Sequence, residues 1–469
     1  MKKKKEYSDY SKSKALRICK FVHILITIIS YSVCLFYYNV QYNHRGVGNT
    51  RFMIFVVLYA AILCFSLRTY KSYDFGLEGV YKLVYSQTLA DIIAGGAFYI
   101  VFVIANSTVF TPLPLIMLLV VQFAINILWS IAVNKAYFKF NKPKKTALIY
   151  NDEEELLGLC EAYSRRQNFD VIKVIKVYDD IDGIKNEVSE CEAVFAAADI
   201  PFLVRNEILK YCVDKGKVFY TSPRIGDILF GGSVYLDMFS VPVFCVSRAQ
   251  LKVEYAFVKR AIDIAVSLLG IIVLSPIMLV TAIAIRAYDK GPALYKQVRL
   301  TKDGKEFKIL KFRSMRVNAE SDGVARLATD HDDRITPIGK IIRACRLDEL
   351  PQLFNILKGE MTIVGPRPER PEIAKQYEEE LPEFRLRLQV KAGLTGLAQI
   401  YGRYNTEPYD KLRMDLMYIN QMSFVKDLRL MLATVKILFV KDSTQGTAEG
   451  QITAMADKKQ NTEREVAAK

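Results

Sequence analysis

Residues 343–359, RACRLDELPQLFNILKG, carry the densest set of local structural signals in the chain. Pro351 suits the first turn of an α-helix, because its fixed φ matches the helix and its missing N–H would have no helical partner there. Gly359 suits the residue that follows the helix, where the left-handed conformation is common. The spacing therefore predicts a helix between these two residues. Its apolar face consists of Leu353, Phe354, Ile356 and Leu357.

Two carboxylates, Asp348 and Glu349, stand directly before this helix. Unpaired N–H groups and the helix dipole stabilise negative charge at such a position and can also receive a phosphate. We therefore expect low pKa values, which suit a nucleophile or a metal ligand. Adjacent side chains diverge too widely to share one proton, so we expect one to attack phosphorus and the other to hold a cation. The structural alternative is ordinary helix capping with an Arg346–Glu349 ion pair.

Residues 362–368, TIVGPRP, predict a strand that runs into a turn. Pro366 and Pro368 restrict the backbone on either side of Arg367, which aims its guanidinium for bidentate contact with a phosphate. Residues 307–315, FKILKFRSM, alternate like a strand. Lys311 and Arg313 therefore share one face, which is either a phosphate-binding face or a solvated basic one.

A glycine-bearing turn, residues 393–403 (GLTGLAQIYGR), carries Gln399 and allows close approach of a ligand, although a plain loop explains it equally well. Two carboxylates among several fixed cations predict a phosphoryl-transfer site, because such transition states require charge neutralisation and positioning. Magnesium fits this site, since Mg²⁺ uses one or two carboxylates together with substrate phosphates.

Four apolar stretches precede this region, at about 18–38, 52–67, 84–105 and 112–133. Each approaches the ~20 residues that a helix needs to cross ~30 Å of hydrocarbon. Basic residues lie before the first stretch, between the second and third, and after the fourth, so the positive-inside rule predicts that both ends are cytoplasmic. We predict a four-helix transmembrane bundle over residues 1–141.

Between residues 142 and 250, short apolar runs alternate with helix-like stretches such as 152–165, which is typical of a small α/β domain with a mainly parallel sheet. Its first run ends in Tyr150-Asn-Asp-Glu153, where dinucleotide binding requires a glycine-rich loop. We therefore predict a cytoplasmic Rossmann-like α/β domain without a dinucleotide site.

A fifth apolar stretch, 264–285, has Ser275 and Pro276 at its centre and basic residues at both flanks. A proline bends a helix, so a re-entrant helix that breaks and returns to the same side satisfies both flanks. A kinked helix that crosses the membrane is the alternative. We predict that the re-entrant helix belongs to a mixed α/β catalytic domain over 251–440, and that 441–469 form a disordered tail.

The composition narrows the choice of partners. Lys and Arg number 65 against 50 Asp and Glu, and 51% of the residues are hydrophobic. This predicts anionic partners and a lipid environment. Three scattered histidines argue against a histidine-rich zinc site, and eight dispersed cysteines suit a reduced core. No recognition motif accompanies the charge, so we expect no nucleic-acid partner.

Seven motifs occur in order from residue 259 onward. They are 259–263 (KRAID), the Ser275-Pro276 break, 311–315 (KFRSM), 336–339 (TPIG), 347–352 (LDELPQ), 364–368 (VGPRP) and 393–396 (GLTG). In these motifs the chain resembles the bacterial polyprenyl-phosphate hexose-1-phosphate transferases, in the large multi-spanning form that initiates exopolysaccharide and capsule synthesis. One departure is Ala392, where relatives often carry proline.

The resemblance implies a ping-pong reaction. Asp348 would attack the β-phosphate of a UDP-sugar, UMP would leave, and polyprenyl (undecaprenyl) phosphate would then displace the phosphosugar. Glu349 would bind Mg²⁺, and the site would face the cytoplasm at the bacterial inner membrane. By the same resemblance, Arg343 and Arg367 would bind the phosphates. We also predict that the substrate contacts include Lys311, Arg313, Pro366, Pro368 and Gln399.

Two other classes of protein stay open. A non-catalytic membrane scaffold of polysaccharide assembly would need no intact Asp348, Glu349 and Arg367. A transporter could use the four helices, but Asp91 is the conspicuous acidic residue within a span, and we expect it near a helix end. The sugar, the role of residues 146–248 and the existence of a homo-oligomer also stay open.

Overall fold

The fold is described by a computed structural model that divides into two compact units, Met1–Ser222 and Pro223–Lys469. The described residues are 2–43, 50–75, 78–107, 109–153, 168–238, 241–249, 251–317, 319, 332, 334–402 and 407–438. The tail predicted over 441–469 and most of the helix-like stretch 152–165 lie outside these ranges.

The first unit begins with long apolar helices. They are α1 (Lys2–Asn43), α2 (Thr50–Thr69), α3 (Val80–Asn106) and α4 (Leu113–Phe140). All four are long and apolar enough to cross a membrane, and the second unit contributes one more such helix. Helices α1 and α3 each pack against both α2 and α4. The chain therefore carries apolar candidate membrane helices where the sequence predicted them.

Polar side chains occupy the interior between these helices. Asn126 of α4 donates from Nδ2 to Asp91 Oδ2 of α3 at 2.7 Å, and its Oδ1 lies 3.0 Å from His23 Nε2 of α1. The expectation that Asp91 sits near a helix end is wrong, because it lies well inside α3 and is buried. Hydrogen bonding to Asn126 makes this burial tolerable, since a buried polar group without a partner is costly.

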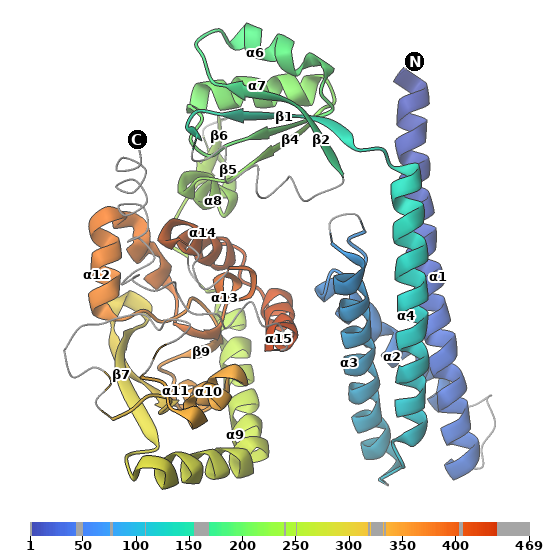
Figure 1. The fold of residues 1–469 in the computed structure, drawn as a ribbon, viewed down its shortest axis with the longest axis vertical. Helices are drawn as coiled ribbons and strands as arrows, with labels where there is room; N and C mark the ends of the chain where they lie inside the picture. Colours follow the sequence, from blue (N-terminus) through green and yellow to red (C-terminus); the bar gives the residue numbers. More distant parts are fainter. Residues whose placement is uncertain are drawn as a thin grey trace. The chain divides into compact units, whose positions relative to one another are not determined.

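A four-stranded parallel sheet follows in the same unit, with strand order β2-β1-β3-β4. The strands are β1 (Lys144–Tyr150), β2 (Phe169–Lys176), β3 (Ala193–Ala196) and β4 (Val218–Thr221). β3 is buried along its whole length, as expected for a central strand covered on both faces. Figure 1 shows α6 (Ile181–Glu187) and α7 (Phe202–Asp214) together on one side of the sheet. This confirms a mainly parallel α/β arrangement.

The second unit starts with α8 (Ile225–Gly231) and a hairpin of β5 (Val234–Met238) and β6 (Val241–Cys245). Ile225 and Ile228 of α8 belong to the hydrophobic core of this second unit, and Asn420 Nδ2 donates to Ile228 O at 2.6 Å. The domain boundaries drawn from the sequence remain predictions, although these contacts associate α8 with the second unit.

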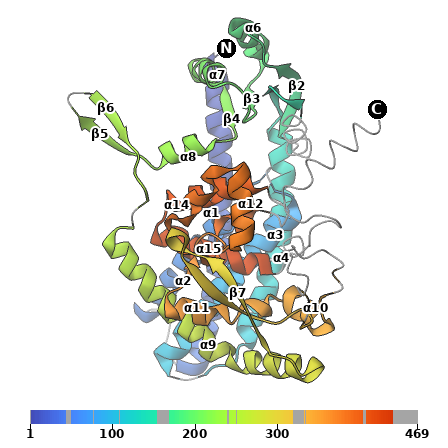
Figure 2. The same cartoon turned by 90° about the vertical axis from the view of Figure 1, so that its left-hand side faces the viewer.

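The helix α9 (Val253–Asp289) contains Pro276 and extends along the second unit. Figure 1 shows α9 bending sharply partway along its length, and Figure 2 shows the bend from a second direction. Its first part packs against α11 (Gln352–Lys358), and its last part contributes Ile285 to a cluster with Phe312 and Ile342. Both parts of the helix therefore contact the same compact unit.

Short strands and helices complete this unit. They are β7 (Leu294–Leu300), β8 (Glu306–Phe312), α10 (Pro337–Ala344), β9 (Thr362–Val364), α12 (Pro371–Glu380), β10 (Gly393–Thr395), α13 (Leu397–Tyr401), α14 (Pro408–Ile419) and α15 (Phe424–Leu438), with 3₁₀ turns η2 (Lys302–Gly304), η3 (Leu347–Glu349) and η4 (Pro382–Gln389). β7 and β8 form an antiparallel hairpin, and β9 pairs in parallel with β10. β8 ends at Phe312, so the predicted strand is shorter than expected and Arg313 follows it.

Two glycines bring the backbones of β9 and β10 unusually close together. A Cβ added to Gly393 would lie 2.1 Å from Gly365 N, and one added to Gly365 would lie 2.5 Å from Lys391 O. Gly365 N donates to Thr395 O and Gly393 N donates to Pro366 O, both at 2.8 Å. The two glycine motifs therefore hold each other, and this contact fixes the loop that follows β9.

We predict that Gly393→Ala destabilises the second unit by about 1–3 kcal/mol or more, because the added methyl group collides with the backbone of Gly365. Gly226→Ala is the matched control, since a Cβ at Gly226 meets nothing within 4 Å. Its effect should stay within about 1 kcal/mol. Thermal unfolding of the full chain in detergent measures both variants, and equal stabilities would contradict the close approach.

Candidate functional site

The acidic pair lies in a turn between two short helices. Thr336 Oγ1 accepts from Gly339 N at 2.9 Å and caps α10, which ends at Ala344. Arg346 then adopts a left-handed conformation with φ 53°, and η3 carries Asp348 and Glu349. Pro351 precedes α11, and Gly359 ends it with φ 87°, which confirms the predicted helix. A left-handed arginine costs about 1–2 kcal/mol, so surrounding contacts must hold this turn.

Glu349 provides the central contacts of the site. Its Oε1 accepts from Lys311 Nζ of β8 at 3.2 Å and from Arg367 Nη2, in the loop after β9, at 3.0 Å. The Glu349 side chain is 13% exposed, whereas that of Arg367 is 40% exposed. The carboxylate therefore joins three segments that are distant in sequence, and it leaves the arginine accessible from solvent.

The two adjacent carboxylates have opposite pKa shifts. Burial alone would raise the pKa of Glu349, but Lys311 and Arg367 outweigh it and hold the pKa below its usual range. For Asp348, burial and then the neighbouring charge of Glu349 raise the pKa, against the opposing influence of Lys311 and Arg343. The expectation of a low pKa is therefore wrong for Asp348, because this carboxyl group is buried beside the charged Glu349, which receives the direct ion pairs. It is met for Glu349.

Other residues predicted for the site are distributed around this pair. Arg343, in the last turn of α10, is close enough to influence the charge of Asp348. Pro366 and Pro368 flank Arg367 and are buried, and their carbonyls accept from Gly393 N at 2.8 Å and Arg299 Nη1 at 3.1 Å. The loop of residues 365–368, here called the arginine loop, is thus fixed by backbone hydrogen bonds as well as by its two prolines.

Two predicted substrate contacts stand apart from these ion pairs. Arg313 Nη2 pairs with Asp289 Oδ1 at the end of α9, so its direct partner is structural. Gln399 lies in α13, and its Nε2 is buried without a hydrogen-bond partner among the described residues. A buried donor of this kind costs about 1–3 kcal/mol when unpaired, which suits a group that a ligand completes.

Residues 254–441 match the family described as bacterial sugar transferase. A UDP-N-acetylgalactosamine-undecaprenyl-phosphate N-acetylgalactosaminephosphotransferase of Aeromonas hydrophila is 40% identical over 187 residues, which are 39% of this chain and 44% of the relative. A UDP-glucose:undecaprenyl-phosphate glucose-1-phosphate transferase of Caulobacter vibrioides is 40% identical over 190 residues, covering 39% of this chain and 71% of the relative. The chain belongs to the bacterial sugar transferase family.

A relative of the same name as the Caulobacter protein, from Klebsiella pneumoniae, is 43% identical over 208 residues, or 43% of this chain and 44% of the relative. The alignments thus span less than half of the Aeromonas and Klebsiella relatives. The similar proteins are named for different sugars. Membership of the bacterial sugar transferase family therefore leaves the sugar open.

The residues around Glu349 determine whether the site suits the magnesium expected for a bacterial sugar transferase. No group of three or more His, Cys, Asp or Glu side chains suited to a metal occurs within the described part of the chain. Asp348 and Glu349 nevertheless supply two adjacent carboxylates, and the ion pairs of Glu349 with Lys311 and Arg367 engage the same oxygen, Oε1. This set fits a Mg²⁺ ion that takes its other ligands from substrate phosphates and water.

Sequence reasoning missed a buried charge network behind Arg367. Arg387, 2% exposed, donates from Nε to Asp415 Oδ2 at 2.8 Å and from Nη2 to the carbonyl of Arg367 at 2.9 Å. Glu369 Oε1 lies 3.6 Å from Arg387 Nη1 and 3.4 Å from Lys411 Nζ. Through Arg387, this network hydrogen-bonds to the backbone of the arginine loop and holds it in place. The sequence signal for this network was the run Pro368-Glu-Arg370, which places charged residues directly after the predicted turn.

Removing one member of this network should destabilise the fold strongly. We predict that Asp415→Asn lowers the free energy of unfolding by about 3–5 kcal/mol, because Arg387 keeps a buried charge with a weakened partner set. Asp410→Asn, on the same helix α14, is the control. Its carboxylate is 49% exposed and pairs with Arg413, so its loss should cost less than about 1 kcal/mol. Equal effects in chemical denaturation would contradict a stabilising role for the network.

Proposed function

We propose that this chain transfers a sugar-1-phosphate from a UDP-sugar to polyprenyl phosphate, releases UMP and so initiates synthesis of a cell-surface polysaccharide. The observation that carries the proposal is the pair Asp348 and Glu349, in which Glu349 is held by Lys311 and Arg367. This pair lies within the region that matches the family of bacterial sugar transferases. Names of similar proteins support the two substrates. The apolar candidate membrane helices support a membrane location, which we propose is the bacterial inner membrane.

In the first proposed step, a carboxylate oxygen of Asp348 attacks the β-phosphorus of the UDP-sugar. A bond forms between that oxygen and phosphorus, and the bond from phosphorus to the bridging oxygen breaks. UMP leaves with the electron pair, and Asp348 carries the phosphosugar as a mixed anhydride. In the second step an oxygen of polyprenyl phosphate attacks the same phosphorus, and the Asp348 carboxylate leaves.

The surrounding cations perform the electrostatic part of this reaction. Phosphoryl transfer depends mainly on positioning and on neutralising charge at the phosphate oxygens. Arg367 is both fixed in its loop and partly exposed, which supports a role in gripping an incoming phosphate. Lys311 and Arg343 supply further positive charge around Asp348. Glu349 would hold Mg²⁺, which supplies additional neutralisation of the substrate phosphates when bound.

The membrane arrangement follows from the same reaction, because a UDP-sugar is water-soluble and its acceptor is a lipid. We propose that α1–α4 form a transmembrane four-helix bundle and that α9 is re-entrant, breaking at Ser275 and Pro276. Contacts at both ends of α9 with one compact unit support the re-entrant form. Apolar side chains between those ends are exposed, as suits a segment in lipid. They include Leu268, Leu269, Ile272, Val273, Leu279 and Val280.

The competing function is a non-catalytic membrane scaffold of polysaccharide assembly. A scaffold has no need of a buried acidic pair that is paired with cations, because burying charge without a functional gain is costly. The arrangement around Glu349 therefore favours the enzyme.

Replacing the nucleophile separates these functions. We predict that Asp348→Asn lowers UMP release from UDP-glucose, UDP-galactose or UDP-N-acetylgalactosamine, whichever is the substrate, by at least about 1,000-fold in the presence of polyprenyl phosphate. An amide in this position is a poor nucleophile and cannot form the mixed anhydride with the phosphosugar. Asp410→Asn should keep wild-type activity, since its carboxylate lies on the exposed side of α14. UMP release that survives in Asp348→Asn would eliminate the proposed nucleophile.

The pH dependence should report the raised pKa of Asp348. The reaction needs the ionised carboxylate, so kcat/KM should rise as the pH increases. The midpoint of this rise, the acidic limb of the pH profile, should lie above the ordinary aspartate pKa of about 3.9. Lys311→Met removes a cation that lowers the pKa of Asp348, so its limb should move to higher pH. Lys305→Met, an exposed neighbour before β8, should leave the limb in place. A shift to lower pH in Lys311→Met would contradict this electrostatic account.

A further inference from the structure

The second unit contains a basic pocket that the proposed reaction does not use. Its volume is about 550 Å³, within the range of about 300–1,000 Å³ that is typical of small-molecule sites. Arg248, Lys259, Arg260, Lys302 and Lys391 line it, against the two carboxylates of Asp263 and Asp303. The site cations Lys311, Arg343 and Arg367 are not among its lining residues. The pocket is therefore distinct from the acidic pair.

Three of these charged lining residues already bind other parts of the protein. Arg260 donates to the carbonyls of Ile356 and Leu357, both at 2.7 Å, and so caps the C-terminal end of α11. Lys259 Nζ lies 2.7 Å from Asp427 Oδ2. Asp263 accepts from Thr362 Oγ1 and from the Ile363 N–H. The Asp263 carboxylate is thus satisfied by neutral donors in the pocket wall.

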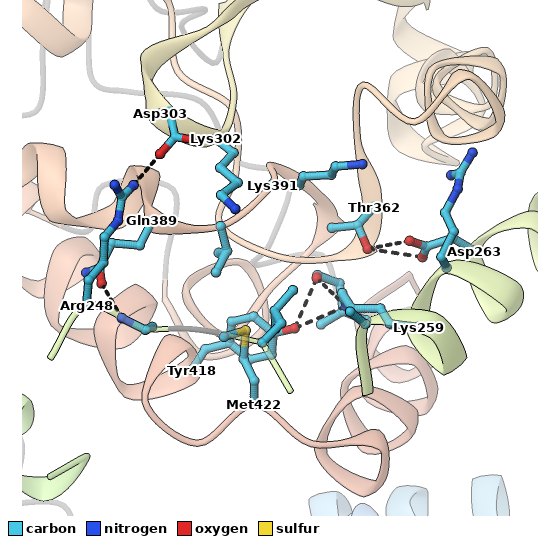
Figure 3. A pocket seen from close by; sticks show the side chains of 16 residues that line it. Arg248, Lys259, Asp263, Lys302, Asp303, Thr362, Gln389, Lys391, Tyr418 and Met422 are labelled. Atoms are coloured by element: carbon cyan, nitrogen blue, oxygen red, sulfur yellow. Dashed lines mark hydrogen bonds and ion pairs between the residues drawn. The ribbon is translucent and has the colours of Figure 1, made fainter. Parts of the chain in front are cut away.

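A further pair closes one end of the pocket. Arg248 Nη2 binds Asp303 Oδ1, and Figure 3 shows this contact beside Lys302. The two carboxylates of the lining are therefore both engaged, one by Arg248 and the other by Thr362 and Ile363. Neither carboxylate makes a direct ion pair with Lys302 or Lys391 within the part of the chain that the structure describes.

Lys302 and Lys391 are the lining cations that carry no structural bond among the described residues. Figure 3 shows both side chains along one side of the pocket, with Tyr418 and Met422 on the other side in this view. Burial and the neighbouring charge of Arg260 lower the pKa of Lys391, the charge of Asp263 opposes this shift, and Lys302 adds a smaller lowering effect. Like charges that line one pocket raise each other's free energy, and a bound anion would relieve this repulsion.

Hydrogen bonds next to Lys302 and Lys391 connect the two segments that carry these lysines. Thr301, directly before Lys302, accepts at Oγ1 from the Ala392 N–H at 3.2 Å and donates to Glu360 O at 3.0 Å. Ala392 directly follows Lys391. One threonine hydroxyl therefore connects the two lysine-bearing segments, so that their spacing is built into the fold before any ligand arrives.

We propose that this pocket binds a phosphate-bearing anion between Lys302 and Lys391, at a site separate from Asp348 and Glu349. Two ammonium groups without structural partners supply the charge-assisted hydrogen bonds that phosphate oxygens prefer. Apolar residues such as Leu251, Val390 and Met422 line the remaining wall and suit the uncharged part of a ligand. The phosphate belongs either to a soluble diphosphate or to the headgroup of an anionic lipid.

The test labels lysine amines of the full chain in nanodiscs with an acetylating reagent and measures each site by mass spectrometry. The soluble arm adds pyrophosphate to nanodiscs of phosphatidylcholine. The lipid arm replaces part of that lipid with phosphatidylglycerol and omits pyrophosphate. We expect acetylation of Lys302 and Lys391 to slow at least about threefold in one arm or both, while Lys305 keeps its rate. Protection in the first arm identifies a soluble phosphate ligand, and protection in the second identifies a lipid headgroup.

Variants keep this test falsifiable. In Lys391→Ala, about tenfold more probe should be needed to protect Lys302 to the same extent, because one charge-assisted hydrogen bond is lost. Lys305→Ala should leave the protection unchanged. Asp348→Asn should also retain it, so that failure of the proposed transferase reaction and failure of this pocket are distinguishable. Unchanged acetylation of both lysines in both arms would overturn the proposal.

Discussion

The carboxylate of Glu349 accepts from Lys311 and Arg367 through one oxygen, and the rest of the site depends on these two contacts. Taking such charges out of water costs several kcal/mol per ion, which is offset only when the partners are close and well oriented. Because β8, η3 and the loop after β9 each supply one partner, they must be held together by the fold. Burial, and then the charge of Glu349, raise the pKa of the neighbouring Asp348.

Positioning of Arg367 explains several features that otherwise look unrelated. The close approach of Gly365 and Gly393 fixes the start of its loop, and Arg387 binds its carbonyl from a buried network. Both devices act on the backbone, so the loop is held in place while the Arg367 side chain remains 40% exposed to solvent. A held backbone with an exposed side chain suits a phosphate-binding arginine, because a pre-positioned arginine loses little conformational freedom on binding.

The parts predicted correctly from sequence are those that local chemistry determines. Pro351 and Gly359 marked the ends of α11, and apolar length marked the candidate membrane helices. What failed depended on contacts between distant segments. The strand expected over 307–315 ends at Phe312, so Arg313, expected to share its face with Lys311, lies just beyond it, and its guanidinium pairs with Asp289. The raised pKa of Asp348 and the burial of Asp415 likewise arise from tertiary packing, which periodicity does not encode.

A covalent phosphosugar on Asp348 is the central claim, and peptide mass spectrometry tests it most directly. The membrane-embedded chain is incubated with a UDP-sugar without polyprenyl phosphate, quenched in acid and digested. The account predicts a mass increase equal to one phosphosugar on the peptide that carries Asp348, which disappears when polyprenyl phosphate is added before the quench. UMP release without any such adduct, or an adduct on another residue, would contradict it.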